Sequence, residues 1–357
     1  MHRILAINPG STSTKFAVYF DSECVLNKTI RHSFDDLFHY ETIIDQFDFR
    51  KGLIIDALVD EGIEVDSLKF IIGRGGLTYP VESGIYKVNN LMLKHLREGV
   101  MGQHASNLGP LLADYIALQI PDAQAFMADP VVTDELENVA RVSGHALFER
   151  RSIFHALNQK AKARSHALKS GKKYEEMNLI VVHLGGGISV GAHKNGRVID
   201  VNNALNGEGP FSPERSGSLP TGQLIEICFS GKYTKSEVDR MVVGEGGFVS
   251  FLGTNSAQEV ENLAASGHEK SRFYQEALFY QVAKSIGEMA VVLEGKVDGI
   301  IFTGGMAYNK TLGFYMNQKV GFIAPIFIYP GEDEFEALAM NALLVARGEV
   351  VPKEYKK

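Results

Sequence analysis

The chain of 357 residues has little cysteine, because Cys24 and Cys228 are the only two. They are too few for a disulfide scaffold and lack the spacing of a metal site, which fits a reducing cytoplasm. The chain also lacks any apolar run that approaches the length needed to span a membrane. It opens with Met1-His2-Arg3 and turns at once into a strand pattern, which is not typical of a signal peptide. We therefore expect a cytoplasmic protein with no membrane partner.

An excess of positive charge is missing as well. Acidic residues outnumber basic ones by 43 to 36, which gives a net charge of −7. This balance does not indicate a nucleic-acid partner, and an anionic metabolite would have to be bound by local charges. The hydrophobic fraction of 45% is ample for real cores, and the length favours two domains. Since predicted strands and helices alternate, we expect an α/β fold.

What the chain does contain is a strand–glycine–strand unit around residues 178–191. Leu179–Val182 is a short buried strand, His183 follows it, and Gly185-Gly186-Gly187 then turn the chain. Consecutive glycines allow positive φ angles and a close approach to a ligand, and their N–H groups can form an anion-binding nest. The alternative is an ordinary hairpin with a flexible turn.

The same unit opens the chain. Ile4–Ile7 is a buried strand that leads into Asn8, a Gly/Ser/Thr turn and a second, alternating strand. A further strand follows each unit, Cys24–Ile30 in the first half and Arg197–Val201 in the second, where Asn195-Gly196 is a strong hairpin signal. Two copies of one unit in one chain predict a duplicated domain with a cleft between the halves.

Three other predicted strands end in residues that could bind an anion or a metal. Leu68–Ile72 leads into Gly73-Arg74-Gly75-Gly76, Ala123–Met127 into Asp129, and Gly299–Phe302 into Gly304-Gly305 before a helix. Ligands of α/β proteins bind at the carboxyl ends of strands, and a helix N-terminus suits a nucleotide. Each of these segments could instead be an ordinary turn.

The rest of the chain is predicted to consist of helices and loops. The long loop Gly207–Pro220 has three prolines and carries Arg215, a candidate for anion contact because long loops in compact domains are usually functional. Gly244–Gly253 is predicted to be another loop. Apolar spacing predicts helices over Glu41–Glu61, Asn90–Gly99, Leu108–Gln119, Arg272–Leu293 and from Glu334 onward.

Charged residues in two of these segments have two possible explanations. Asp134–Lys169 is rich in helix formers, and its basic run is predicted to be a solvated helix face comprising Arg150, Arg151, Lys160, Lys162 and Arg164. Glu332 and Glu334 precede or open the last helix, where acidic residues suit the helix dipole. A magnesium site is the functional alternative for this acidic pair.

Four of these motifs, in this order, resemble the butyrate kinases, a branch of the acetokinase family in the acetate and sugar kinase/Hsp70/actin superfamily. They are Asn8–Lys15, similar to the carboxylate-kinase signature, His183–Ser189, similar to a phosphate loop, Pro213–Gly217, similar to the substrate-arginine loop, and Phe302–Gly305, similar to the adenosine motif. The resemblance covers essentially the whole length. Acetate kinases carry a histidine next to the first active-site arginine, whereas Gly73-Arg74-Gly75-Gly76-Leu77 has none, which favours the butyrate branch.

The resemblance implies duplicated ribonuclease H-like (actin-like ATPase) domains around a central interdomain cleft. One half would span 1–145 plus 333–357, with the last helix packed against the N-terminal sheet, and the other 146–332. The implied reaction is ATP + butyrate ⇌ ADP + butyryl phosphate with Mg²⁺, extending to branched short-chain acids, in a homo-oligomer of two or more subunits. Acetate or propionate kinase, or an actin- or Hsp70-like ATPase, are the alternatives.

The resemblance also implies roles for individual residues. Arg74 and Arg215 would clamp the carboxylate and the transferring phosphoryl group, His183 would donate to phosphoryl oxygens, and His104 would orient the acceptor. Asp129 and Glu334 would lie near the metal, with Glu332 as the alternative to Glu334. The residues implied near the ATP/ADP phosphates and the adenosine are Asn8, Ser11, Ser13, Lys15, Gly185, Gly186, Gly187, Gly304 and Gly305.

Overall fold

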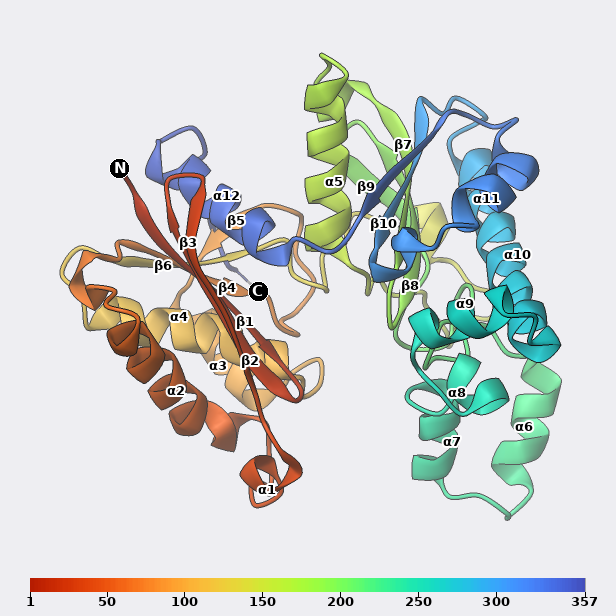
Figure 1. Cartoon of the computed structure of the whole chain (residues 1–357), viewed down its shortest axis with the longest axis horizontal. Helices are drawn as coiled ribbons and strands as arrows, with labels where there is room; N and C mark the ends of the chain where they lie inside the picture. The colour runs from red at the N-terminus through yellow and green to blue at the C-terminus, as the bar shows by residue number, and fades with distance from the viewer. Residues whose placement is uncertain (357) are drawn as a thin grey trace. The chain divides into compact units, whose positions relative to one another are not determined.

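The computed structural model describes residues 1–356, and the chain divides into two compact units (Figure 1). One comprises Met1–Thr133 and Asp333–Lys357, and the other Asp134–Glu332. The domain limits expected from the sequence, 1–145 plus 333–357 and 146–332, stay a prediction. Within residues 1–356, no helix combines the length and the apolar character that a membrane span requires.

The first unit is built on a sheet whose strand order, among the described residues, is β12-β5-β6-β4-β1-β2-β3. Its strands are β1 Arg3–Gly10, β2 Ser13–Phe20, β3 Glu23–Arg31, β4 Phe70–Arg74, β5 Ile85–Lys87, β6 Gln124–Ala128 and β12 Lys353–Glu354. β1, β2 and β3 pair antiparallel, whereas β1, β4 and β6 run parallel. The carboxyl ends of β1, β4 and β6 therefore lie along one edge of the sheet.

Helices cover both faces of this sheet (Figure 1). On one face, Leu5, Ile7 and Ile71 form a core cluster with residues of α2 Phe47–Asp60, α3 Asn90–Glu98 and α4 Leu108–Leu118. Because side chains alternate along a strand, the buried Ile4 and Ala6 point to the other face, where α12 Glu334–Ala346 contacts β1 and β4. The expectation that the last helix packs against the N-terminal sheet is confirmed.

The second unit has the strand order β11-β10-β7-β8-β9. Its strands are β7 Asn178–Leu184, β8 Ile188–Lys194, β9 Arg197–Val201, β10 Gly299–Gly304 and β11 Ile326–Pro330. Its helices are α5 Ala156–Lys169, α6 Thr221–Phe229, α7 Lys235–Val242, α8 Gly247–Leu252, α9 Ala257–Ala265, α10 Glu269–Val292 and α11 Leu312–Val320. The α10 and α11 helices pack on one face of the sheet and α5 on the other (Figure 1).

The two sheets share one topology, which confirms the predicted duplication. In each, three antiparallel strands come first, β1-β2-β3 or β7-β8-β9. Two parallel strands are then added on the far side of the first strand, β4 and β6 in one unit and β10 and β11 in the other. β7 is thus the counterpart of β1, and β10 that of β4. The predicted cleft between the halves stays a prediction.

Most predicted elements are present, and three segments differ. The helix expected over Glu41–Glu61 begins with a 3₁₀ turn, Ile44–Gln46, before α2. The expected loop Gly244–Gly253 contains the helix α8, which starts at Gly247 with φ 57° and is capped by Gly253 at φ 74°. The glycines there bound a short helix instead of preventing one.

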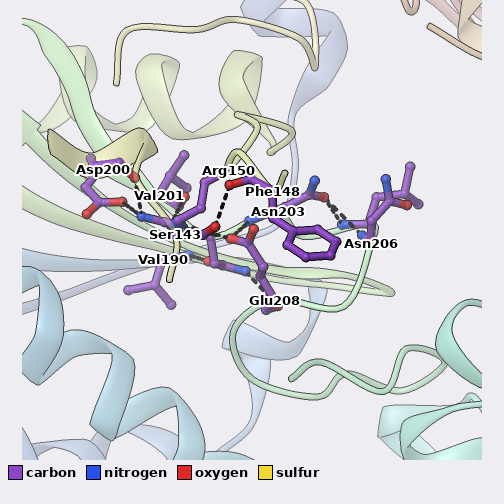
Figure 2. Close-up of polar contacts among 12 residues, drawn as sticks. Ser143, Phe148, Arg150, Val190, Asp200, Val201, Asn203, Asn206 and Glu208 are labelled. Carbon is purple, nitrogen blue, oxygen red and sulfur yellow. Dashed lines mark hydrogen bonds and ion pairs between the residues drawn. The ribbon is translucent and has the colours of Figure 1, made fainter. Parts of the chain in front are cut away.

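The prediction that the basic run is a solvated helix face is wrong. The chain is α-helical only from Ala156 in this segment, and Lys160 is fully buried with its Nζ 2.7 Å from Glu135 Oε2. Figure 2 shows Arg150 between Asp200 and Glu208, where its guanidinium lies 2.9 Å from Asp200 Oδ1 and 3.4 Å from Glu208 Oε2. Both cations form ion pairs with acidic residues that are remote in the sequence. A local sequence pattern does not reveal such pairs.

Candidate active site

β7 ends in His183 and passes through three glycines into β8. None of Gly185, Gly186 and Gly187 is among the described residues with positive φ, so the turn does not use the positive φ angles that glycine allows. Their missing side chains matter instead. A Cβ on Gly187 would lie 2.1 Å from Arg215 Nη1, and one on Gly185 would lie 3.0 Å from His183 Nε2. A side chain at Gly187 would displace the Arg215 guanidinium, and one at Gly185 would crowd the His183 ring.

The hydrogen bonds of His183 fix its tautomer. Asn158 Nδ2 donates to the Glu332 carbonyl at 2.7 Å, so the Asn158 oxygen faces His183 Nδ1 at 2.8 Å. His183 Nδ1 therefore carries a proton. Nε2 is buried and has no hydrogen-bond partner within residues 1–356, with Glu332 Oε1 at 3.6 Å. Because Nδ1 already carries a proton, Nε2 can donate a hydrogen bond only when the ring carries a second proton.

His155 was missed by the sequence reasoning. Its ring stacks on that of His183, with centroids 3.8 Å apart and 9° between the planes. Its Nδ1 lies 2.9 Å from Ser189 Oγ on β8. His155 immediately precedes α5, and the packing of α5 on β7 brings the two rings together. The local sequence carried no signal beyond a segment rich in basic residues.

Arg215 lies in the loop between β9 and α6. Its Nη1 donates to the Ala204 carbonyl at 2.6 Å, and its Nε is buried without a hydrogen-bond partner within residues 1–356. Burial lowers the pKa of Arg215, with Glu214 opposing that effect, yet a guanidinium remains charged in proteins. A buried cationic donor without a partner is costly, which makes this group suited to an anionic ligand.

A cavity of about 340 Å³ lies within the second unit. Its lining includes Gly185 and Gly186 of the loop after β7 and Gly305 and Met306 of the turn after β10. Gly304, at φ 89°, brings these two turns together, because a Cβ there would lie 2.3 Å from the Leu184 carbonyl oxygen. The predicted phosphate loop and adenosine motif therefore line one cavity.

In the first unit, Asn8, Arg74 and Glu334 form a cluster at the ends of β1 and β4 and the start of α12. Arg74 Nη2 lies 3.0 Å from Glu334 Oε1, and Nη1 lies 3.2 Å from Oε2 and 3.3 Å from Asn8 Oδ1. Asn8 Nδ2 donates to the same carboxylate. The carboxylate thus holds the arginine in a bidentate pair. Three predicted site residues that are remote in the sequence meet here.

The turn between β1 and β2 is held by Arg50, which the sequence reasoning also missed. Its guanidinium donates to the carbonyls of Gly10 at 2.8 Å, Ser11 at 3.1 Å and Ser13 at 2.7 Å. The side chain is fully buried, and burial lowers the pKa of Arg50 to about 10. Lys15 lies opposite Asn8 in the β1–β2 register, so the two side chains share one face of the sheet.

His104 and Asp129 each make local contacts that account for their positions. His104 Nδ1 accepts from the Ser106 amide at 3.2 Å and caps the 3₁₀ turn Ala105–Asn107. Asp129 follows β6 with φ 38°, is 2% exposed and accepts from the Gly84 amide at 2.7 Å. The catalytic and metal roles predicted for these two residues stay predictions.

Similarity to known proteins identifies the family. The model of the acetokinase family matches residues 140–314. Over 356 residues, 100% of both chains, this chain is 55% identical to "Butyrate kinase 1" of Clostridium acetobutylicum, and it is 53% identical to "Butyrate kinase 2" of the same organism over 99% of both chains. The chain belongs to the acetokinase family. It is therefore a phosphotransferase with a carboxylate as acceptor.

Solved structures of this family have the same fold. An acetate kinase of Porphyromonas gingivalis superposes with a TM-score of 0.80 at 16% identity, over 97% of this chain and 100% of that one. A propionate kinase of Francisella tularensis gives a TM-score of 0.76 at 19% identity, over 96% and 99%. At such identities the likeness establishes the duplicated actin-like ATPase fold alone.

The family also implies magnesium, for which single carboxylates are the available ligands. Within residues 1–356, no group of three or more His, Cys, Asp or Glu side chains is placed to hold a metal. Magnesium is commonly bound by only one or two carboxylates together with phosphate oxygens and water. Asp129 and Glu334 are suitable oxygen donors, although Glu334 is engaged by Arg74. Magnesium binding by Asp129 and Glu334 stays a prediction.

Proposed function

We propose that this protein transfers the γ-phosphoryl group of ATP to butyrate, reversibly, giving butyryl phosphate and ADP. The full-length identity of 55% to a butyrate kinase carries this proposal. The cavity lined by the glycines of two strand ends supports nucleotide binding in the second unit. Arg215 Nε and His183 Nε2, both buried without a hydrogen-bond partner within residues 1–356, support binding of an anion there.

In this proposal the protein positions the reactants and neutralises charge, which is its main task in phosphoryl transfer. A carboxylate oxygen of butyrate attacks the γ-phosphorus, a P–O bond forms, and the bond to the ADP oxygen breaks. The acid is already ionised at neutral pH, so no base has to remove a proton. Arg74 holds the carboxylate, while Arg215 and the His183 imidazolium donate to the transferring group. His155 supports His183 through its stacked ring.

The remaining roles follow the same proposal. The phosphates lie against Gly185, Gly186 and Gly187, the adenosine against Gly304 and Gly305, and Asn8, Ser11, Ser13 and Lys15 lie near the phosphate end. Magnesium, when bound, neutralises the phosphate charge, with Asp129 and Glu334 as its protein ligands and Glu332 as the alternative. His104 orients the acceptor. A cytoplasmic location and a homo-oligomer are further parts of the proposal.

Chain-length preference tests the proposed acceptor. Butyrate has two more methylenes than acetate, and each buried methylene is worth roughly 0.8 kcal/mol. Two give about 1.6 kcal/mol, so we expect kcat/KM for butyrate to exceed that for acetate by at least ~15-fold, with isobutyrate and isovalerate still accepted. Initial rates on a C2 to C5 acid series, with acyl phosphate trapped by hydroxylamine, measure this.

Two other outcomes would contradict the proposal. Equal or better turnover of acetate would assign the chain to the acetate branch and leave the phosphoryl-transfer chemistry in place. ATP hydrolysis without trapped acyl phosphate for any acid would instead favour an actin- or Hsp70-like ATPase.

A further inference from the structure

Gln275 lies on α10 and lines the cavity shared by the turns after β7 and β10. Its Oε1 atom is buried and has no hydrogen-bond partner within residues 1–356. An unpaired buried acceptor is unfavourable, and such groups in native proteins call for an explanation. A donor on a ligand in the cavity would satisfy it.

Neighbouring contacts fix which end of the Gln275 amide is the nitrogen. Asn309 Oδ1 accepts the backbone N–H groups of Thr311 at 2.9 Å and Leu312 at 3.2 Å, so this atom must be the oxygen. The Thr311 hydroxyl donates to the same oxygen at 2.8 Å, which leaves its lone pairs to accept from Gln275 Nε2 at 3.2 Å. The Gln275 nitrogen is thereby engaged, and the oxygen is the end of the amide that is left without a partner within residues 1–356.

The other lining residues favour a base as the partner of this oxygen. Phe248 and Phe279 are among the lining residues and are 1% and 3% exposed, so apolar core residues lie directly beneath the surface of the cavity. The Glu261 side chain also lines the cavity, and carboxylates commonly accept hydrogen bonds from ribose hydroxyls. Adenine presents a donor in its 6-amino group, whereas guanine presents an acceptor at the same position.

We propose that Gln275 selects adenine: its Oε1 accepts a hydrogen bond from the 6-amino group of the base. Hypoxanthine and guanine carry a 6-oxo acceptor there and are disfavoured, because two acceptors would face each other in a desolvated site. This inference rests on the proposed function, since it requires that the cavity bind a nucleotide.

Calorimetric titration of the full chain with Mg·ADP and Mg·IDP tests the inference. The wild type should bind ADP at least ~10-fold tighter than IDP, the effect of one lost buried hydrogen bond. Gln275→Leu should bring this ratio close to 1, mainly by weakening ADP. Thr311→Val removes the anchor of the amide, which can then turn its nitrogen toward a 6-oxo group. The ratio should shrink in that variant while both nucleotides still bind.

Gln318→Leu is the matched control, because Gln318 is exposed on α11 and lies outside the cavity lining. It should keep the wild-type ratio. Circular dichroism melting checks the fold of each variant, and Thr311→Val carries the test if Gln275→Leu does not fold.

Three results would overturn the inference. If the ratio of the affinities for ADP and IDP is unchanged in Gln275→Leu, Gln275 does not select the base. The same conclusion follows from an unchanged ratio in Thr311→Val if Gln275→Leu does not fold. A Gln275→Leu variant that no longer distinguishes ADP from 2′-deoxy-ADP, yet still prefers ADP to IDP, would assign the oxygen to the ribose. Failure of the wild type to bind either nucleotide would overturn the proposed function as well, a pattern distinct from binding without discrimination.

Discussion

His183 and Arg215 are alike in one respect: each presents a buried nitrogen that has no hydrogen-bond partner within residues 1–356. A second nitrogen of each side chain is engaged, His183 Nδ1 by Asn158 and Arg215 Nη1 by the Ala204 carbonyl. These contacts therefore leave one buried nitrogen of each side chain available to bind a ligand. Such preorganised donors can stabilise developing charge without rearranging during the reaction.

Replacing Arg215 with alanine should lower kcat by ~10²-fold or more, by analogy with the loss of other charge-stabilising donors. Binding of ATP should change little, because the glycine loop and the cavity remain. Steady-state kinetics with butyrate and calorimetry with the nucleotide measure the two quantities. Arg272→Ala, at an exposed position on α10, is the control. A near-normal kcat in the Arg215 variant would show that Arg215 does not stabilise the transferring group.

His193 gives a pH dependence of stability. It is fully buried, and its neutral ring is bonded to the Tyr174 hydroxyl at 2.7 Å and to Gln159 Oε1 at 2.9 Å. Burial, aided by the charge of Lys160, lowers the pKa of His193 to about 3. Below about pH 6.5, His193 therefore binds a proton in the unfolded chain but stays neutral in the folded chain. Stability from this group is complete above that pH and falls by up to ~1.4 kcal/mol per pH unit below it.

The variant His193→Gln should accordingly show a flatter dependence of the unfolding free energy between pH 6.5 and 5. Urea unfolding of both proteins across this range measures the difference in slope. His32 and His166, whose pKa values burial also lowers, are present in both proteins, so their contributions cancel. Parallel curves would show that His193 titrates normally.

At the scale of elements, the candidate site residues of each unit lie on or beside turns at the carboxyl ends of parallel strands. In the first unit these are Asn8 of β1 and Arg74 of β4, and in the second unit they are His183 of β7 and the Gly304 turn of β10. Two of these turns are held in place by residues from elsewhere in the chain. Arg50 holds the turn after β1 through three backbone carbonyls, and Arg215 lies against Gly187 in the turn after β7.

Replacing Arg50 with glutamine should loosen the β1–β2 turn. The shorter amide cannot reach these carbonyls, and losing hydrogen bonds to a charged group costs about 1.5–3 kcal/mol each in buried settings. We expect a loss of several-fold or more in hydrogen-exchange protection at Ser13 and Thr14, together with a lower melting temperature. Arg31→Gln, on the exposed end of β3 beside the same turn, should leave both unchanged. Equal protection in the two variants would contradict the proposed clamp.

At the scale of the whole molecule, the order of elements along the chain differs from their grouping in space. The last helix follows directly after the second unit in sequence and belongs to the first. It buries Leu338 and Leu343 against the sheet of the first unit. Burial of two leucine side chains contributes roughly 3–6 kcal/mol, which is comparable with the whole stability of an ordinary domain.

The variant Leu338→Ala should therefore destabilise the first unit by ~2–5 kcal/mol, the usual cost of such a cavity. Hydrogen-exchange mass spectrometry should show lower protection in β1 and β4 and unchanged protection in β7 and β10. Met340→Ala, two residues along the same helix and 39% exposed, is the control and should change stability by less than ~0.5 kcal/mol. Uniform loss of protection across both units would contradict this division.

The sequence by itself determined the strand–glycine–strand units, their duplication and the types of residue at the strand ends. These follow from local patterns, because apolar runs and glycines act on their immediate neighbours. The roles of Arg50, His155, Lys160 and Gln275 were decided only by the tertiary structure. Arg50 finds its carbonyls near Gly10, Lys160 finds its carboxylate in Glu135, and Gln275 is oriented by Thr311. Whether a polar side chain is solvated, paired or left with one free atom depends on groups that folding brings from elsewhere in the chain.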